Sequence, residues 1–214
     1  MARETQSGRN AHFVVSSLGE AGSNGTPEQR AEESKTAAKL LGASIEFIEL
    51  DGDSHLEIRA EHALRLAAII RRMQPETLLA PSCVENQHPD HSRLGRLVRD
   101  AARLARYGGL KELSDQKTHS VKQLFFYAVT PDGEPRDTPP VLIDISAAAI
   151  MSAWTAAMNA HESQASTRNY VDLQLTRAKL FGARAGVDYA MAVYPNDPLV
   201  FDSLADAGRG ARRF

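Results

Sequence analysis

The sequence predicts an α/β fold class, a three-layer Rossmann-like domain with a mainly parallel sheet. Short β-rich runs alternate with helical patterns along the first half of the chain. Such alternation is typical of parallel strands that are joined by crossover helices. No repeat and no Pro/Gly-rich linker interrupts the chain. We therefore expect one domain over residues 1–214, with the loops after its strands at one edge of the sheet, where ligand sites of such folds lie.

Each element follows from a local pattern, taken in chain order. Strands are expected where apolar runs are bounded by turn residues, at residues 12–19, 44–50, 77–81, 124–130 and 140–146. Helices are expected where apolar residues recur at helical spacing, at residues 27–41 and 63–73, from Ser92 onward, around Trp154 and at 171–182. Thr26 is expected as the N-cap of the first helix, with Pro27 at the first helical position and Gln29 completing a capping box.

Composition bounds the class of protein. The chain has 25 Lys and Arg against 27 Asp and Glu, so its formal net charge is -2. This balance gives no electrostatic case for binding nucleic acid or an anionic membrane. A single cysteine, Cys83, excludes an internal disulfide, and no apolar run is long enough to span a bilayer. The polar N-terminus lacks the apolar core of a signal peptide, so we expect a cytoplasmic protein.

Two histidines stand three residues apart directly before an amphipathic helix. His88 and His91 flank Pro89 and Asp90, at the end of an expected strand. One imidazole can hold a metal while the other acts as acid or base, and Asp90 can fix a tautomer by accepting an imidazole N–H. The alternative is a plain turn in which Asp90 is the N-cap of the helix from Ser92. On residue types alone, both interpretations stay open.

Other polar residues carry the same two kinds of interpretation. Arg30, in the first turn of its helix, could hold an anionic or hydroxylated substrate or be a surface arginine. Asp51, Asp53 and His55 follow an expected strand and could supply metal ligands, or could be ordinary turn residues. His161 shares a face with apolar residues, which favours a partly buried, hydrogen-bonded histidine. Cys83 is expected to be a small buried thiol.

Several blocks, taken in order, resemble the LmbE-like, or PIG-L, family of zinc-dependent N-acetylglucosamine deacetylases. The similar segments cover nearly the whole chain, and they read LGEAGSNGTPEQRAEESKTAAKLLGA, ELDG, NQHPDH with VRDAARLA, DIS, AHESQ and GARAGVDYA. The resemblance implies that His91 is a zinc ligand. It implies that His88 stabilises the oxyanion or acts as the acid, with Asp90 orienting it, and that Arg30 and Asp51 contact the substrate. The implied partner is a small-molecule aminosugar conjugate, and self-association is left open.

The chain departs from the family pattern at several places. No segment matches the family's earlier His-Pro-Asp-Asp motif, which supplies two zinc ligands and the general base. The start of the chain resembles the end of the helix after that motif, so we expect the first strand and metal-binding loop to be missing. Met191 stands where the family usually has Glu, and Trp154 where it often has Lys. The Zn²⁺ ligand set is therefore expected to be incomplete, unless Asp51, Asp53 or His55 substitutes.

The expected function is zinc-dependent hydrolysis of an N-acetyl group on an N-acetylglucosamine-type conjugate, impaired in the chain as given. The alternative is a non-catalytic binder of sugar conjugates that has lost its metal. An unrelated α/β hydrolase or nucleotide-binding protein ranks third, because the sequence has no Gly-x-Ser-x-Gly motif and no phosphate-binding glycine loop.

Overall fold

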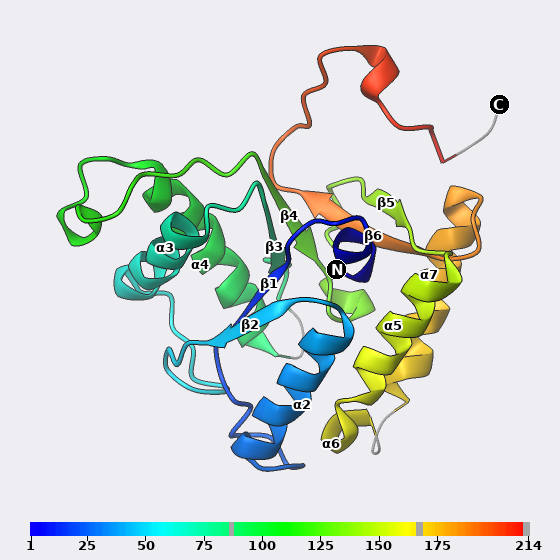
Figure 1. Cartoon of the computed structure of the whole chain (residues 1–214), viewed down its shortest axis with the longest axis horizontal. Helices are drawn as coiled ribbons and strands as arrows, with labels where there is room; N and C mark the ends of the chain where they lie inside the picture. The colour runs from blue at the N-terminus through cyan, green and yellow to red at the C-terminus, as the bar shows by residue number, and fades with distance from the viewer. Residues whose placement is uncertain (86–87, 166–168, 212–214) are drawn as a thin grey trace. The chain divides into compact units, whose positions relative to one another are not determined.

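The computed structural model describes residues 1–85, 88–165 and 169–211. The chain divides into two compact units (Figure 1). The first unit comprises Met1–Asp53, Leu142–Met191 and Arg209–Phe214, and the second comprises Ser54–Val141 and Ala192–Gly208. Among the described helices, none combines the length and the apolar character needed to cross a bilayer.

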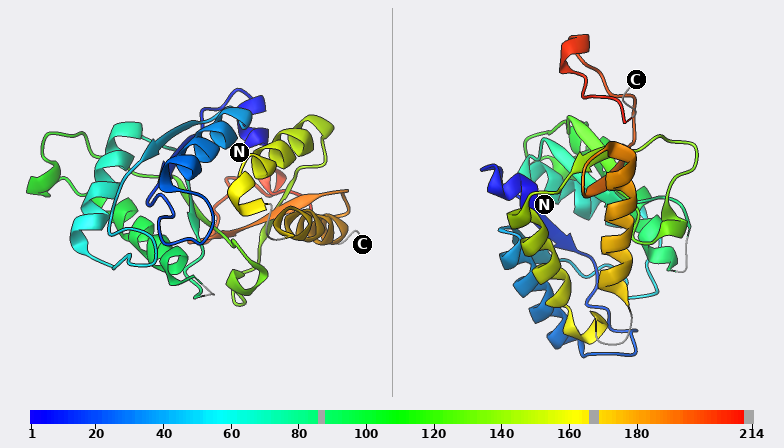
Figure 2. Two further views of the ribbon diagram at one scale, coloured as in Figure 1. Left: turned by 90° about the horizontal axis from the view of Figure 1, so that it is seen from below. Right: turned by 90° about the vertical axis from the view of Figure 1, so that its right-hand side faces the viewer.

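The first unit contains a pair of parallel strands. Strand β1 (His12–Val15) pairs with β2 (Ser44–Phe47), with His12 opposite Ser44 and Val15 opposite Phe47. The helices of this unit are α1 (Ala2–Gln6), α2 (Pro27–Leu40), α5 (Ala148–Asn159), α6 (Glu162–Ala165) and α7 (Tyr170–Ala185). Helices α2 and α5 lie side by side, as both views in Figure 2 show. The helix α2 is thus the crossover that joins two parallel strands, as the sequence predicts.

The start of α2 shows why its sequence folds locally into a helix. Thr26 is the N-cap, and its hydroxyl oxygen accepts the backbone N–H of Gln29 at 3.2 Å. Pro27 occupies the first helical position, where its missing N–H leaves no hydrogen bond unmade. The side chain of Gln29 donates to Glu33 at 3.1 Å. The predicted N-cap is confirmed.

A small apolar core organises the other helices of the first unit. Its buried members are Ala2, Ile145, Ile150 and Ala178. Trp154 and Met191, two of the residues at which the sequence departs from the resemblance, pack against this cluster. Both side chains therefore have a packing role in this chain.

The second unit is built on a parallel strand pair backed by two helices. Strand β3 (Thr77–Pro81) runs parallel to β4 (Gln123–Tyr127), and β4 runs antiparallel to the end of β6 (Ala190–Pro195). Helices α3 (Ala60–Met73) and α4 (Pro89–Arg106) pack on each other, and α4 also packs on β3. Short 3-10 turns cover Lys111–Leu113, Pro131–Gly133 and Leu204–Asp206. Strand β5 (Val141–Asp144), whose residues 142–144 belong to the first unit, lies beside β6 in the sheet.

The apolar stripe predicted for α4 forms the contact with its neighbours. Leu97, Ala101 and Ala105 are fully buried. A glycine lets the helix approach the strand closely, because a Cβ built on Gly95 would lie 2.2 Å from the carbonyl oxygen of Pro81. This close approach brings the first turn of α4 to the carboxyl end of β3.

The α/β class and its parallel strands are thus confirmed, whereas a single domain over the whole chain stays a prediction. Several element boundaries differ from expectation by a few residues. Strand β2 ends at Phe47 instead of residue 50, β4 covers Gln123–Tyr127 instead of residues 124–130, and α3 begins at Ala60 instead of residue 63. Two further differences bear on the site. Strand β1 ends at Val15, and the residues up to Gly19 form a loop. Helix α4 begins at Pro89, with His88 at the N-cap position, so Asp90 lies inside the first turn and is not the cap. Proline at the first helical position explains the earlier start.

Candidate functional site

The first turn of α4 brings together the three polar residues that the sequence singles out. His88 has an extended backbone, and Pro89 begins the helix. Residues 88 and 91 then lie one turn apart, and their imidazole centroids are separated by 5.3 Å. The Nδ1 atoms of both rings are shielded from solvent. Two imidazoles therefore share one small region at the carboxyl end of β3.

Asp90 connects this turn to the segment after residue 53. Its Oδ2 accepts the backbone N–H of Ser54 at 2.7 Å, and its Oδ1 lies 3.4 Å from Nη1 of Arg93. The same Arg93 nitrogen donates to the carbonyl of Leu56 at 3.0 Å. Asp90 and Arg93 thus fasten residues 54–56 to α4. The predicted role of Asp90 in orienting His88 stays a prediction.

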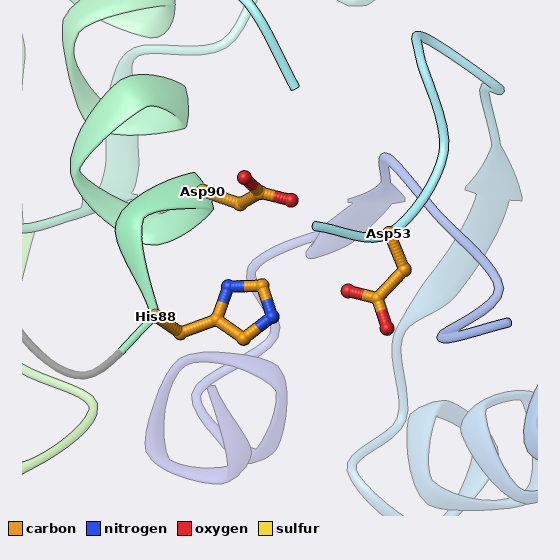
Figure 3. Close-up of side chains that lie close together, drawn as sticks. All are labelled: Asp53, His88 and Asp90. Carbon is orange, nitrogen blue, oxygen red and sulfur yellow. The ribbon is translucent and has the colours of Figure 1, made fainter. Parts of the chain in front are cut away.

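Asp53 completes a group with metal-ligand chemistry. Its peptide bond to Ser54, whose N–H is held by Asp90, keeps it next to the α4 turn. Figure 3 shows the Asp53 carboxylate directed toward the His88 ring, with Asp90 on the helix turn beside it. Asp53, His88 and Asp90 each offer one ligand atom, and these atoms all lie within 4.8 Å of one another. One imidazole and two carboxylates fit a divalent metal such as zinc.

The composition of this group differs from the set that the resemblance implies. His88 and Asp90, expected as catalytic residues, belong to it. His91, expected as the ligand, is not among its members, although its ring lies beside that of His88. Asp53 is one of three residues of the DGDSH loop that could substitute for missing ligands, whereas the set expected from the sequence is incomplete. Asp51, expected to contact substrate, lies in the same loop and is partly exposed.

Arg30 is engaged by the loop that follows β1. Its Nη1 donates to the carbonyl of Gly19 at 2.6 Å, and its Nε and Nη2 donate to the carbonyl of Asn24 at 3.0 and 2.8 Å. A Cβ built on Gly19 or on Gly22 would lie 2.1 Å from a guanidinium nitrogen. The loop can close around Arg30 because these two residues are glycines. Arg30 therefore shapes the loop, a role that the sequence does not predict.

Arg30 also lines a cavity of about 210 Å³ within the first unit. Its wall includes Ser17 from the loop after β1 and Phe47 from the end of β2, together with His161 and Gln164. A guanidinium, a hydroxyl, an amide and an aromatic ring are groups that bind a polar ligand with an apolar face. The cavity is thus a candidate place for the substrate contact expected of Arg30.

A buried carboxylate lies in the wall of this cavity. Glu33 is 8% exposed and accepts both the N–H and the hydroxyl of Ser163, at 2.9 and 2.7 Å. Burial acts to raise the pKa of Glu33, but the hydrogen bonds from Ser163 and Gln29 outweigh it, so the pKa lies below its usual value. Burial lowers the pKa of His161, and the nearby Glu33 charge opposes this. His161 is partly buried, as expected.

Comparison with known proteins adds to this geometry. The family model of the GlcNAc-PI de-N-acetylases, PIG-L, matches residues 1–102, which include Arg30, Asp53 and the first turn of α4. The solved structure of the conserved protein TT1542 from Thermus thermophilus is 30% identical, with a TM-score of 0.82 over 96% of this chain and 90% of that one. The sequence match and the shared fold thus concern the same part of the chain that carries the candidate site.

Two further relatives carry named activities. A 4-oxalmesaconate hydratase of Pseudomonas putida KT2440 is 31% identical over 123 residues, which are 52% of this chain and 47% of the relative. The matched stretch thus spans about half the length of that curated relative. The N,N'-diacetylchitobiose deacetylase of Pyrococcus horikoshii is 22% identical, with a TM-score of 0.77 over 91% of this chain and 75% of that one. At that identity the likeness concerns the fold alone.

Proposed function

The chain belongs to the PIG-L family, and on that premise we propose that it hydrolyses the N-acetyl (amide) group of an N-acetylglucosamine-type conjugate with the help of zinc. One observation carries the proposal. Asp53, His88 and Asp90 place an imidazole and two carboxylates within 4.8 Å of one another. Amide hydrolysis at neutral pH is served by such a combination of metal ligands and proton-transfer groups.

The residues of the α4 turn take complementary roles. A divalent metal would supply Lewis-acid polarisation of the amide carbonyl and make water more acidic. Asp53 and an imidazole of the turn would hold it. The other imidazole would stabilise the developing oxyanion and protonate the leaving amine. Asp90 keeps the turn and the Asp53 segment together through the N–H of Ser54.

The resemblance and the geometry assign the two imidazoles differently. The resemblance gives His91 to the metal and His88 to proton transfer, whereas the group defined by distance contains His88. Separate His88→Ala and His91→Ala variants decide between them. The variant that loses zinc has lost the ligand, and the variant that keeps zinc while turnover falls has lost the acid or oxyanion group. Alanine fits the extended backbone of residue 88 and the helical backbone of residue 91, so both variants should fold.

Substrate binding is assigned to Arg30 and Asp51. Arg30 lines the cavity of about 210 Å³, and the three hydrogen bonds of its guanidinium leave further N–H groups for a ligand hydroxyl. An aminosugar conjugate offers both hydroxyl groups and an apolar ring face, which Phe47 at the cavity wall can cover. Arg30→Lys, which keeps the charge, is expected to raise KM more than it lowers kcat.

The deciding experiment measures zinc content and acetate release by the chain of residues 1–214. N-acetylglucosamine conjugates serve as substrates, and Asp53→Asn is compared with Glu49→Gln, an exposed carboxylate shortly before it in the chain. We expect zinc and acetate release to be lost in Asp53→Asn and kept in Glu49→Gln. Normal zinc uptake and turnover by Asp53→Asn would contradict the proposed ligand group.

A second candidate is hydration of an unsaturated carboxylate, because the curated relative at 31% identity is a 4-oxalmesaconate hydratase. Both reactions add water to a carbon atom that a metal and an acid can activate. The same preparation is therefore tested with 4-oxalmesaconate by following loss of its absorbance. Hydration without acetate release would replace the deacetylase assignment. Conjugate binding with neither reaction would favour the non-catalytic alternative.

A further inference from the structure

Glu20 joins the two loops that follow the strands of the first unit. Its Oε1 accepts the backbone N–H of Asp53 at 2.7 Å, and its Oε2 accepts the backbone N–H of Leu18 at 3.0 Å. One carboxylate therefore links the loop after β1 to the loop after β2, across 33 residues of sequence. Hydrogen bonds to an ionised acceptor are about twice as strong as neutral ones.

The backbone around Glu20 is shaped to admit this carboxylate. Gly52 has a φ of +88°, and a Cβ built on it would lie 2.7 Å from Oε1 of Glu20. A side chain at position 52 would therefore be strained and would also collide with the carboxylate. On its other side the same loop is held by Arg30, which donates to the carbonyl of Gly19. The loop after β1 is thus held in two ways, by the hydrogen bonds of Glu20 and by the hydrogen bond from Arg30 to Gly19.

We propose that Glu20 is a positioning residue that sets the place of Asp53 for metal binding. The inference rests on the proposed function, in which Asp53 is a metal ligand. Glu20 holds the main chain of Asp53, so the Asp53 carboxylate starts from one fixed backbone position. Without that hold, part of the metal-binding free energy would be spent on ordering the loop. Groups that orient metal ligands typically contribute about 10- to 100-fold in metal affinity.

Glu20→Gln isolates this role because it keeps the shape of the side chain. A glutamine amide has one oxygen, which can accept one of the two N–H groups, and its NH₂ faces the other with a second donor. Glu49→Gln is the matched control, since it removes the same charge from an exposed position shortly before Asp53 in the chain. The control separates loss of the hydrogen bonds from loss of negative charge.

The experiment has two readouts on the chain of residues 1–214. The first is the zinc Kd, measured by competition with a chromophoric chelator. The second is the hydrogen-exchange rate of the Leu18 and Asp53 amides in the metal-free protein. For Glu20→Gln we expect the Kd to rise about 10- to 100-fold and the exchange of at least one of the two amides to quicken about tenfold. Glu49→Gln should change neither readout.

The outcomes separate this inference from the proposed function. Zinc uptake by Glu20→Gln within twofold of the wild-type chain would refute the positioning role alone. A wild-type chain that takes up no zinc would refute the proposed function and this role with it. If Glu20→Gln does not fold, Gly52→Ala tests the same contact with Glu20 present, because its Cβ displaces the carboxylate. That variant should weaken zinc binding in the same direction, and unchanged affinity would overturn the inference.

Discussion

Replacing Arg71 by methionine should destabilise the second unit, although no part of the proposed site would be touched. Arg71 is 3% exposed, a rare degree of burial for an arginine. Its guanidinium points at the C-terminal end of α4 and the turn beyond it. It donates to five carbonyl oxygens, those of Leu104, Ala105, Tyr107, Leu113 and Gln116. The last carbonyls of a helix have no partner within it, so Arg71 serves as a cap supplied by α3.

The size of the effect follows from which carbonyls keep another donor. In Arg71→Met, the carbonyls of Leu104, Ala105 and Leu113 retain backbone N–H donors from Tyr107, His119 and Gln116. The carbonyls of Tyr107 and Gln116 lose the Arg71 donor. A buried acceptor that is left unsatisfied costs roughly 1–3 kcal/mol. Because both carbonyls are only part-buried, the lower part of that range applies, about 1–2 kcal/mol each, which gives a loss of about 2–4 kcal/mol in the free energy of unfolding. The release of a buried charge acts in the opposite direction.

Urea unfolding followed by circular dichroism measures this loss. Arg72→Met is the control, because Arg72 is the exposed neighbour on the same helix, and it should change the free energy of unfolding by less than about 0.5 kcal/mol. The amide of His119, which donates to Ala105, should exchange faster in Arg71→Met. A loss below about 0.5 kcal/mol would show that desolvation of the guanidinium cancels its hydrogen bonds, and would refute the reasoning.

Three further predictions concern packing, a thiol and pH. Gly95→Ala should lower the Tm, because its Cβ would lie 2.2 Å from the carbonyl oxygen of Pro81, whereas Gly109→Ala meets open space; equal Tm values would contradict the close approach of α4. Burial raises the pKa of Cys83, so iodoacetamide should alkylate it more slowly in the native chain than in urea; equal rates would contradict this. Burial lowers the pKa of His161 in the folded chain. As the pH falls below about 6.5, His161 is therefore protonated in the unfolded chain before it is protonated in the folded chain, and the free energy of unfolding decreases. His161→Gln should flatten the Tm profile between about pH 7.5 and 5.5, and an unchanged profile would count against it.

Local chemistry makes much of the fold predictable. The start of α2 needs three neighbouring residues, and Thr26, Pro27 and Gln29 occupy the predicted positions. Strand β3 has the predicted bounds, Thr77–Pro81, because an apolar run between a turn and a proline leaves little choice. A start of α4 at Ser92, with Asp90 as its cap, is wrong by three residues, since Pro89 already adopts the first helical position. Pro89 and Asp90 both favour a helix start, and the sequence does not show which of them begins the helix. The contact of Asp90 with Ser54, which lies far away in the sequence, occupies the Asp90 side chain that would otherwise cap the helix.

The supporting residues of the site cannot be predicted in the same way. Glu20 contacts the N–H of Asp53, and Glu33 contacts Ser163, which lies 130 residues further along the chain. Nothing in the neighbourhood of Glu20 indicates which backbone amide it will meet, because that depends on where two loops end. Arg30 illustrates the converse. Its place in a family-like block favours a substrate contact, yet the structure shows it also bonded to the carbonyls of Gly19 and Asn24.

These long-range contacts have a consequence for how metal binding and folding are linked. Asp53 comes from the loop after β2, whereas His88 and Asp90 come from the first turn of α4. The backbone next to Asp53 is held at two adjacent residues. The N–H of Asp53 donates to Glu20, and the N–H of Ser54 donates to Asp90. A metal held by Asp53 and His88 would bind the folded chain and not the unfolded one, so its binding free energy would add to folding stability. Glu20 and Asp90 hold the backbone of residues 53 and 54. Loss of either carboxylate should therefore reduce the stabilisation of the fold by zinc.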